Sequence, residues 1–271
     1  MPSSKLTNTG VVQAIERGCR ILDLLGKGKQ SYSIHDLFYE LKLPKPTIHR
    51  ILSTLNHFGY VVKEEASKEY RLGFRLVELG QAVLDQIDLR KEAEPFLSVL
   101  AGLVQETVHL VILDQGEIVY LDKVERVSDP RGLRMASRVG MRNYAHSCAV
   151  GKVLLAFLSD PERDEIFAQK GLPRLTKNTI VDIDKLKKHL ARVRAQGYAV
   201  DDEENEQGIR CVAAPVRNDR GEVIAAISIS GPSVRITKER IPRELVTQVV
   251  KTAAEVSRKI GFKSGISGER R

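Results

Sequence analysis

Residues 33–63 contain the pattern that most restricts how this chain can fold, because two amphipathic helical stripes follow each other with only a short break between them. Ser33 stands where an N-capping side chain would accept a backbone N–H, and Leu43 with Pro44 ends the first stripe. Pro46 can open the second helix, because the first turn needs no N–H from it, and Gly59 ends that helix. The two stripes consist of Ile34, Leu37, Phe38 and Leu41, and of Ile48, Ile51, Leu52 and Leu55. This pattern predicts a helix-turn-helix at about residues 35–54.

The flanking segments extend this motif into a small domain. Ahead of it, a further helical stripe is formed by Val12, Ile15, Cys19, Leu22 and Leu25. After Gly59, the segment YVVKEEASKEYRLG alternates apolar and polar residues on both sides of a polar turn, which predicts a β-hairpin. Three helices followed by a hairpin make a winged helix-turn-helix domain, which we predict at residues 11–73.

The face of the second helix that lies opposite its apolar stripe carries short hydroxyl side chains and cations. In a helix that enters the major groove of double-stranded DNA, such side chains can reach base edges and phosphates. Arg50 is the best candidate for reading a base, because arginine can bind guanine through two hydrogen bonds. The alternative role of Arg50 is an ion pair with an acidic neighbour. Phosphate contacts are predicted from the start of the second helix and from the wing. Together with these, the predicted DNA-contact residues are Lys45, Thr47, His49, Arg50, Ser53, Lys68 and Arg71.

The composition is compatible with a polyanionic partner and excludes several classes of protein. The formal charge is +8, and residues 1–75 hold 12 Lys and Arg against 7 Asp and Glu, so the basic excess is concentrated around the helix-turn-helix. No run approaches the ~18 apolar residues of a membrane span, and no secretory signal is visible, which predicts a cytoplasmic protein without membrane contact. The three cysteines lie far apart, so neither a zinc site nor a disulfide framework is expected, and no cofactor is predicted.

The rest of the chain predicts a linker helix at residues 74–87 and a second domain at residues 88–264. A helix over residues 89–105 is predicted from a stripe that includes Phe96, Val99, Leu100 and Leu103. Further helices are predicted at residues 146–158, 161–171, 182–197 and 240–259, and strands at residues 108–125 on both sides of a Gln-Gly turn, 133–139, 211–218 and 222–231. The second domain is therefore of the α+β class, with an antiparallel sheet and peripheral helices.

Two features of the second domain suggest a site for a small anion. Ser147 to Lys152 begin a predicted helix, where free backbone N–H groups and the helix dipole favour a carboxylate. Ser228 and Ser230 lie two positions apart on one predicted strand, so their hydroxyls share a face and could bind one ligand. The alternative is that these serines face solvent on an edge strand.

Other chemistries are less well supported. Cys148 and His146 could act as nucleophile and base of a small-molecule enzyme with an accessory nucleic-acid domain, but no third residue that would orient them is evident. Around Lys152 the residues of a phosphate-binding loop are missing. The acidic run at residues 201–206 predicts a solvated loop rather than a metal site, and Cys211 is expected to be a packed core thiol.

Several strings in the chain resemble the IclR family of bacterial transcription regulators. LPKPTIHRIL, GYV and YRLG resemble the recognition helix and wing of that family, although Pro46 stands where serine is common. VYLDKVE, RVGMRNYAHSCAVGKVLLAFL, GYAVDDEENEQGIRCVAAPV and AAISISGP resemble its effector-binding half. The resemblance covers nearly the whole chain, and it implies a GAF-like ligand domain, homodimers formed largely through the N-terminal domains and often homotetramers.

Carried over residue by residue, the resemblance implies that the effector is bound by Met135, Ala149, Val150, Asp201, Cys211, Ser228 and Ser230. Ala149 and Val150 replace the smaller residues that are common in the family, which would make the pocket smaller. The sequence thus predicts a ligand-responsive regulator, more a repressor than an activator, whose operator affinity changes when a small carboxylic acid binds. A Cys148/His146 enzyme and a DNA-binding architectural protein without a ligand are the alternatives.

Overall fold

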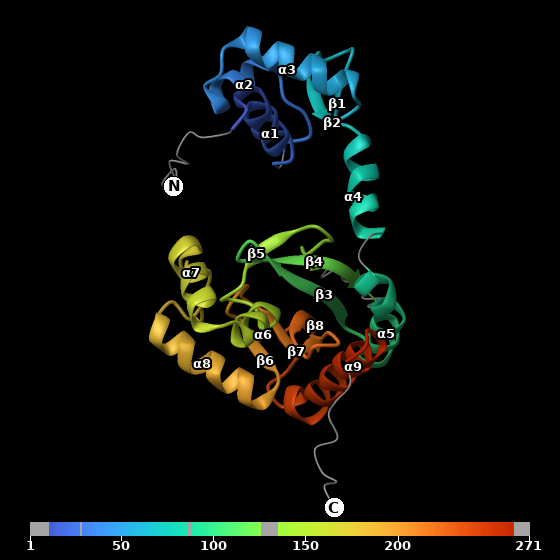
Figure 1. Cartoon of the computed structure of the whole chain (residues 1–271), viewed down its shortest axis with the longest axis vertical. Coiled ribbons are helices and arrows are strands. Elements are labelled where there is room, and N and C mark those ends of the chain that lie inside the picture. Colours follow the sequence, from blue (N-terminus) through green and yellow to red (C-terminus); the bar gives the residue numbers. More distant parts are fainter. Residues whose placement is uncertain (1–10, 28, 86–87, 126–134, 263–271) are drawn as a thin grey trace, which may run out of the picture. The chain divides into compact units, whose positions relative to one another are not determined.

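The computed structural model describes residues 11–27, 29–85, 88–125 and 135–262, and the chain divides into two compact units between helices α4 and α5 (Figure 1). The helix that was predicted as a linker belongs by its contacts to the first unit. In the described part of the chain, no helix is both long and apolar enough to cross a membrane.

The first unit is a three-helix bundle with a two-stranded antiparallel wing. Its core is built from the apolar faces of all three helices and the first wing strand, with Ile21, Leu37, Ile48, Leu52 and Val61 fully buried. The elements are α1 (Gln13–Leu25), α2 (Ile34–Leu41), α3 (Lys45–His57), β1 (Val61–Lys63), β2 (Tyr70–Leu72) and α4 (Arg75–Asp85).

Local signals in the sequence place the ends of α2 and α3. The Ser33 side chain accepts a hydrogen bond from the Asp36 backbone, and the Asp36 carboxylate accepts one from the Ser33 backbone, which together form a capping box. Lys42 ends α2 in a left-handed conformation (φ 58°), and Pro44 is the N-cap of α3. The predicted helix-turn-helix is therefore present in the structure.

The predicted stripe of α1 is only partly correct. Val12 and Ile15 are 59% and 65% exposed, and Cys19 is exposed as well, whereas the fully buried Ile21 was not part of the stripe. The helix carries apolar residues on more than one face, and its packing against α2 and α3 selects the face that contains Ile21 and Leu25.

The second unit is a six-stranded antiparallel sheet covered by helices on both faces (Figure 1). The strand order is β5-β4-β3-β8-β7-β6, so β8 and β3 are central and β5 and β6 are the edges. The elements are α5 (Asp88–Val104), β3 (Thr107–Asp114), β4 (Glu117–Val124), β5 (Arg142–Tyr144), α6 (Ala149–Phe157), α7 (Asp160–Lys170), α8 (Ile183–Gln196), β6 (Ala199–Asp202), β7 (Ile209–Arg217), β8 (Val223–Pro232), the π-helical turn η1 (Ile241–Leu245) and α9 (Val246–Lys259).

Alternation along the central strands separates two cores. Ile227 and Ile229 of β8 belong to the core that α5 and α9 cover, whereas Ala226 belongs to the core that α6 and α8 cover. Ser228 and Ser230 share the parity of Ala226 and therefore lie on the α6 face of the sheet. They are 3% and 2% exposed on a central strand, so the alternative of two solvent-facing serines on an edge strand is wrong.

Three predictions for the second unit need correction. In α5, Val99 and Leu103 are 72% and 59% exposed, because the sheet and α9 bury the neighbouring face with Leu97 and Ala101. A strand was predicted at residues 133–139, but residues 135–139 do not form one, and residues 133–134 lie outside the described residues. The short strand β5 follows this segment. The acidic run begins inside an unpredicted strand, β6.

Candidate functional site

The outward face of α3 presents most of the predicted DNA-contact residues together. Ile48 and Leu52 are fully buried and hold the helix against the bundle, so the residues on its opposite side are directed outward. Lys45, His49, Arg50 and Ser53 are exposed there, Thr47 is half-buried, and Lys68 and Arg71 are exposed on the wing. The structure thus presents one polar surface from α3 and a second from the wing.

Arg50 forms no ion pair with any residue in the described ranges, so the alternative role that the sequence left open for it is not observed. Lys45 is held near the start of α3, with its Nζ 3.3 Å from Nδ1 of His35 and 5.5 Å from the centre of the Phe38 ring. On the wing, Lys68 pairs with Glu65 at 2.9 Å, which offsets part of the charge that it could offer to a phosphate.

Asn56 connects α3 to the wing, because its Oδ1 accepts a hydrogen bond from the Lys63 backbone at 3.2 Å. Asn56 was not predicted as a site residue, since a lone asparagine near a helix end has no distinctive pattern. The contact fixes the wing relative to α3, and this makes Asn56 a positioning residue for that surface.

In the second unit, strand register places the other predicted residues side by side on the α6 face of the sheet. Asp201 of β6 lies directly opposite Cys211 of β7, and Cys211 lies opposite Ser230 of β8. In a neighbouring row, His109 of β3 lies opposite Ser228. Directly opposed residues have Cβ atoms only about 5 Å apart, so the side chains of each row converge.

A narrow cavity of about 30 Å³ is lined by these rows, by the beginning of α6 and by the loop after β6. All seven residues that the resemblance implied for the effector line this one cavity. The lining consists of His109, Tyr120, Met135, Cys148, Ala149, Val150, Asp201, Asn205, Glu206, Ile209, Cys211, Ser228 and Ser230. We call it the effector cavity, and its volume in this conformation is that of one or two water molecules.

Six of the lining residues were not among those that the resemblance implied, and His109 is the most informative of them. Its Nε2 lies 2.9 Å from the Ser137 hydroxyl and its Nδ1 lies 3.4 Å from the Ser228 hydroxyl, while Ser228 lies 3.2 Å from Ser230. Burial, with a smaller contribution from the charge of Lys123, lowers the pKa of His109 to about 3. A neutral imidazole therefore links the Ser137 hydroxyl to the hydrogen-bonded pair of Ser228 and Ser230.

The electrostatics of the cavity come from dipoles and from the two carboxyl groups of Asp201 and Glu206 rather than from cations. Among the described residues, no lysine or arginine lines it. Ala149 and Val150 belong to the first turn of α6, where backbone N–H groups lack an acceptor within the helix. Burial raises the pKa of Asp201 to about 7, against the opposing effect of Lys152, so its carboxyl group is partly protonated near neutral pH.

The geometry does not support a Cys148/His146 catalytic pair. The Cys148 thiol donates to the Tyr144 carbonyl at 3.4 Å, and burial raises its pKa to about 12, so the reactive thiolate is scarce. The His146 ring instead contacts the Pro173 carbonyl, with Nε2 3.0 Å from that oxygen. The two side chains are thus engaged with different backbone groups.

The acidic run is only in part the solvated loop that was predicted, because Glu206 is exposed but two of its acidic residues are buried. Asp201 is 1% exposed and Glu204 is 6% exposed, and Oε1 of Glu204 lies 2.5 Å from Nζ of Lys152, whose side chain is completely buried. Lys152 also donates to the Val200 carbonyl at 2.5 Å. Nothing in the sequence marks Lys152 as special, but its positive charge compensates the carboxylate of Glu204 and so allows that residue to be buried.

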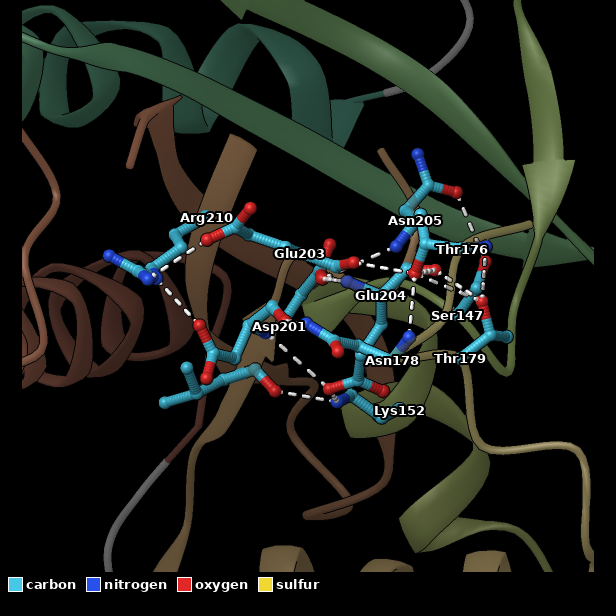
Figure 2. Close-up of polar contacts among 12 residues, drawn as sticks. Ser147, Lys152, Thr176, Asn178, Thr179, Asp201, Glu203, Glu204, Asn205 and Arg210 are labelled. Carbon is cyan, nitrogen blue, oxygen red and sulfur yellow. Dashed lines mark hydrogen bonds and ion pairs between the residues drawn. The ribbon is translucent and has the colours of Figure 1, made fainter. Parts of the chain in front are cut away.

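Hydrogen bonds connect this buried pair to the loop that borders the effector cavity (Figure 2). Oδ1 of Asp201 accepts from the Glu204 backbone at 2.7 Å, and Oδ1 of Asn205 accepts from the Ser147 hydroxyl at 3.0 Å. The Thr179 hydroxyl donates to the Glu204 carbonyl at 2.7 Å. The loop is thereby held between the beginning of α6 and the segment at residues 176–179.

Gly151 allows the beginning of α6 to approach the preceding segment closely. A Cβ atom at this position would lie 2.1 Å from the Ala145 carbonyl oxygen and 2.4 Å from its Cα. Only glycine fits at that separation, so the first turn of α6 can lie directly against the segment that precedes it.

Comparison with known proteins gives a consistent result for both units. Residues 14–65 match the family model described as the IclR helix-turn-helix domain, and residues 81–258 match the model described as bacterial transcriptional regulator IclR C-terminal. The chain is 39% identical over 242 residues to the HTH-type transcriptional regulator KdgR of Dickeya chrysanthemi, a match that covers 89% of this chain and 78% of that one. It is 36% identical to the regulator XynR of Escherichia coli (93% and 98% covered) and 36% identical to the repressor AllR of Salmonella typhi (94% and 92% covered).

Solved structures share the same fold. A transcriptional regulator of Rhodococcus sp. RHA1 matches with a TM-score of 0.81 and 33% identity, over 92% of this chain and 98% of that one. Thermotoga maritima IclR matches with a TM-score of 0.74 and 34% identity, over the same shares. An IclR homologue of Microbacterium hydrocarbonoxydans, solved in complex with 4-hydroxybenzoate, matches with a TM-score of 0.78 and 25% identity, over 91% and 98% of the two chains.

Proposed function

Because the chain belongs to the IclR family of bacterial transcriptional regulators, it is a DNA-binding regulator rather than an enzyme, and we propose that it is a repressor whose operator affinity changes when a small carboxylic acid enters the effector cavity. The α3 residues Arg50, His49 and Ser53 are proposed to read base edges. Lys45 and the wing residues Lys68 and Arg71 are proposed to contact phosphates. Thr47, half-buried beside them, completes the proposed contact set.

The observation that carries the effector proposal is the convergence of the first turn of α6 with Ser228 and Ser230 on one cavity. Backbone N–H groups and hydroxyls can donate to a carboxylate, and the helix dipole favours its charge. The solved complex of the Microbacterium homologue holds 4-hydroxybenzoate, which is a carboxylic acid. In this conformation the cavity has room for one or two water molecules, so the proposal requires it to widen when the acid enters.

A homodimer, alone or as part of a homotetramer, is proposed as the DNA-binding form, because a two-fold symmetric protein matches a palindromic operator. Exposed Val12 and Ile15 on α1 support a further packing partner for the first unit, since apolar side chains of this size are usually buried. A cytoplasmic location is part of the proposal, because such a regulator must reach chromosomal DNA.

The decisive experiment is a gel shift on DNA upstream of the protein's own gene and neighbouring genes, repeated with a panel of small carboxylic acids and at two salt concentrations. We expect specific retardation that one acid alters and that the corresponding amide does not. Specific DNA binding that none of the acids alters would favour an architectural protein. Retardation that disappears equally for all DNA fragments as salt rises would show phosphate attraction without an operator.

Arg50→Ala is expected to weaken operator binding by about 1–3 kcal/mol and to relax specificity at one base position. Arg50→Lys is the matched control, because it keeps the charge but cannot form the paired hydrogen bonds of a guanidinium with guanine. Binding titrations on the operator and on its single-base variants measure both effects. If Arg50→Lys binds and discriminates like the unchanged protein, Arg50 contacts a phosphate and not a base.

The double variant Ser228→Ala/Ser230→Ala replaces both serines of the cavity. Without the acid, its operator affinity is expected to be unchanged. The acid concentration needed for a half-maximal response is expected to rise about 10-fold, because one or two hydrogen bonds to the ligand are lost. Ser257→Ala is a matched control, since Ser257 is 2% exposed but donates to the Ala253 carbonyl in α9, away from the cavity lining. The response is read in the same gel shift. An unaltered acid response in the double variant would place the ligand elsewhere.

A further inference from the structure

A second cavity, of about 440 Å³, lies along α8 and is lined by an excess of cationic side chains. We call it the basic cavity. Its titratable lining residues are Arg174, Asp182, Lys185, Lys188, His189 and Arg192. Its volume falls within the range of about 300–1,000 Å³ that is usual for small-molecule sites, and it shares no lining residue with the effector cavity.

The positive charges of the basic cavity are not neutralised by the protein. Lys185, Lys188 and Arg192 form no ion pair with any residue of the four described ranges. Asp182 is the acidic residue of the lining, and its Oδ1 is engaged as the N-cap of α8 by the Lys185 backbone at 2.8 Å. By contrast, Lys187 on the same helix pairs with Asp164 at 2.7 Å. Cations gathered in a concave site in excess of the single carboxylate of its lining raise the local potential and attract an anion.

His189, one of the residues that line the same cavity, carries a polar atom without a partner. The Nε2 atom of His189 is buried and has no hydrogen-bond partner among the described residues. Burial, with smaller contributions from the charges of Lys152 and Arg192, lowers the pKa of His189 to about 4, so the ring is neutral near pH 7. A buried polar atom without a partner is costly in a folded protein, and a turn of the His189 ring toward the cavity would let a ligand oxygen satisfy it.

We propose that the basic cavity is a second ligand site, which binds a phosphoryl group carried by inorganic phosphate or by a small phosphate monoester. A phosphoryl group bears nearly two negative charges at neutral pH and several acceptor oxygens, which suits a site with two arginines, two lysines and a neutral imidazole.

The basic cavity is joined to the effector cavity by hydrogen bonds (Figure 2). Asn178 and Thr179 line the basic cavity, and they donate to the Asp202 and Glu204 carbonyls at 3.0 and 2.7 Å. The next residue, Asn205, lines the effector cavity. A phosphoryl ligand that holds the segment at residues 176–179 therefore also restrains the loop beside the effector, and the two sites are coupled through that loop.

Calorimetric titration of the full-length protein tests the site, with inorganic phosphate, glucose 6-phosphate and glucose as probes. We expect phosphate or its ester to bind and glucose not to bind. The variant Lys188→Gln/Arg192→Gln should weaken binding at least 10-fold. The control Lys251→Gln/Arg258→Gln, which removes the same charge from exposed positions of α9, should not. Equal affinities of the two double variants, binding of glucose, or no binding of either phosphate probe would overturn the proposal.

Two further measurements separate this site from the proposed operator and effector functions. Without phosphate, both double variants should bind operator alike, whereas a selective loss of DNA affinity in Lys188→Gln/Arg192→Gln would make the surface a DNA contact and contradict the proposal. Hydrogen exchange with saturating phosphate probe should slow at residues 174–192 and also at residues 199–209. Protection confined to residues 174–192 would contradict the coupling between the cavities.

Discussion

Lys152→Met is expected to destabilise the protein by about 3–5 kcal/mol, because it leaves the Glu204 carboxylate buried without its cation. Methionine has nearly the length of lysine, so the effect of lost charge is not mixed with that of a large cavity. The Lys152 side chain is completely buried, and its Nζ lies 2.5 Å from both the Glu204 carboxylate and the Val200 carbonyl. Urea unfolding followed by circular dichroism gives the change in free energy of unfolding.

The double variant Lys152→Met/Glu204→Gln should recover most of that stability, because the uncompensated charge is removed together with its partner. Lys187→Met is a surface control: Lys187 pairs with Asp164 at 2.7 Å, but both side chains are at least one-third exposed, so a loss below about 1 kcal/mol is expected. If Lys152→Met lowers the free energy of unfolding by no more than this control does, then Glu204 without its cation is not a costly buried charge.

Asp201→Asn is expected to stabilise the protein, and by more at high pH than at low pH. Burial raises the pKa of Asp201 from 3.8 to about 7 in the folded protein, so the folded state binds a proton that the unfolded chain releases. The stability that this proton contributes is complete below pH 3.8, falls as pH rises and is lost above pH 7. At about 1.4 kcal/mol per pKa unit, ionised Asp201 costs roughly 4 kcal/mol above pH 7.

Asparagine carries no such cost and can still accept a hydrogen bond from the Glu204 backbone through its Oδ1. The difference in unfolding free energy between Asp201→Asn and the unchanged protein should therefore grow by roughly 2–3 kcal/mol from pH 5 to pH 8. Urea titrations at these two pH values measure it. A difference that is independent of pH would mean that Asp201 ionises at its ordinary pKa in the folded protein.

Local patterns were sufficient to predict most helices and strands, and they failed where a helix had more than one apolar face. The N-cap at Ser33 depends on residues a few positions apart and is present as predicted, and Asp182 and Gly197, which bound the helix predicted at residues 182–197, are the N-cap and C-cap of α8. In α5, Val99 and Leu103 were as plausible for the core as Leu97. The docking of the sheet and α9 decides between them, and this contact joins distant parts of the chain.

The candidate effector site was predicted from a resemblance and not from the residues alone. Ser228 and Ser230 were as compatible with an exposed edge strand, and their burial depends on the position of β8 between β3 and β7. His109 could not be found, because a single histidine in an apolar strand has no periodic signal. Strand register, which places it opposite Ser228, connects positions 119 residues apart.

By itself, the sequence determined the helix-turn-helix of residues 33–63, its wing and the caps of its helices, because each depends on neighbours within a few turns of chain. Tertiary structure alone decided that Asp201 and Glu204 of the acidic run are buried in the core instead of lying in a solvated loop. Lys152 and Glu204 are 52 positions apart, and neither is buried at a tolerable cost without the other. Burial of charge depends on which distant residues the fold brings together, whereas helix periodicity depends only on residues a few positions apart in the chain.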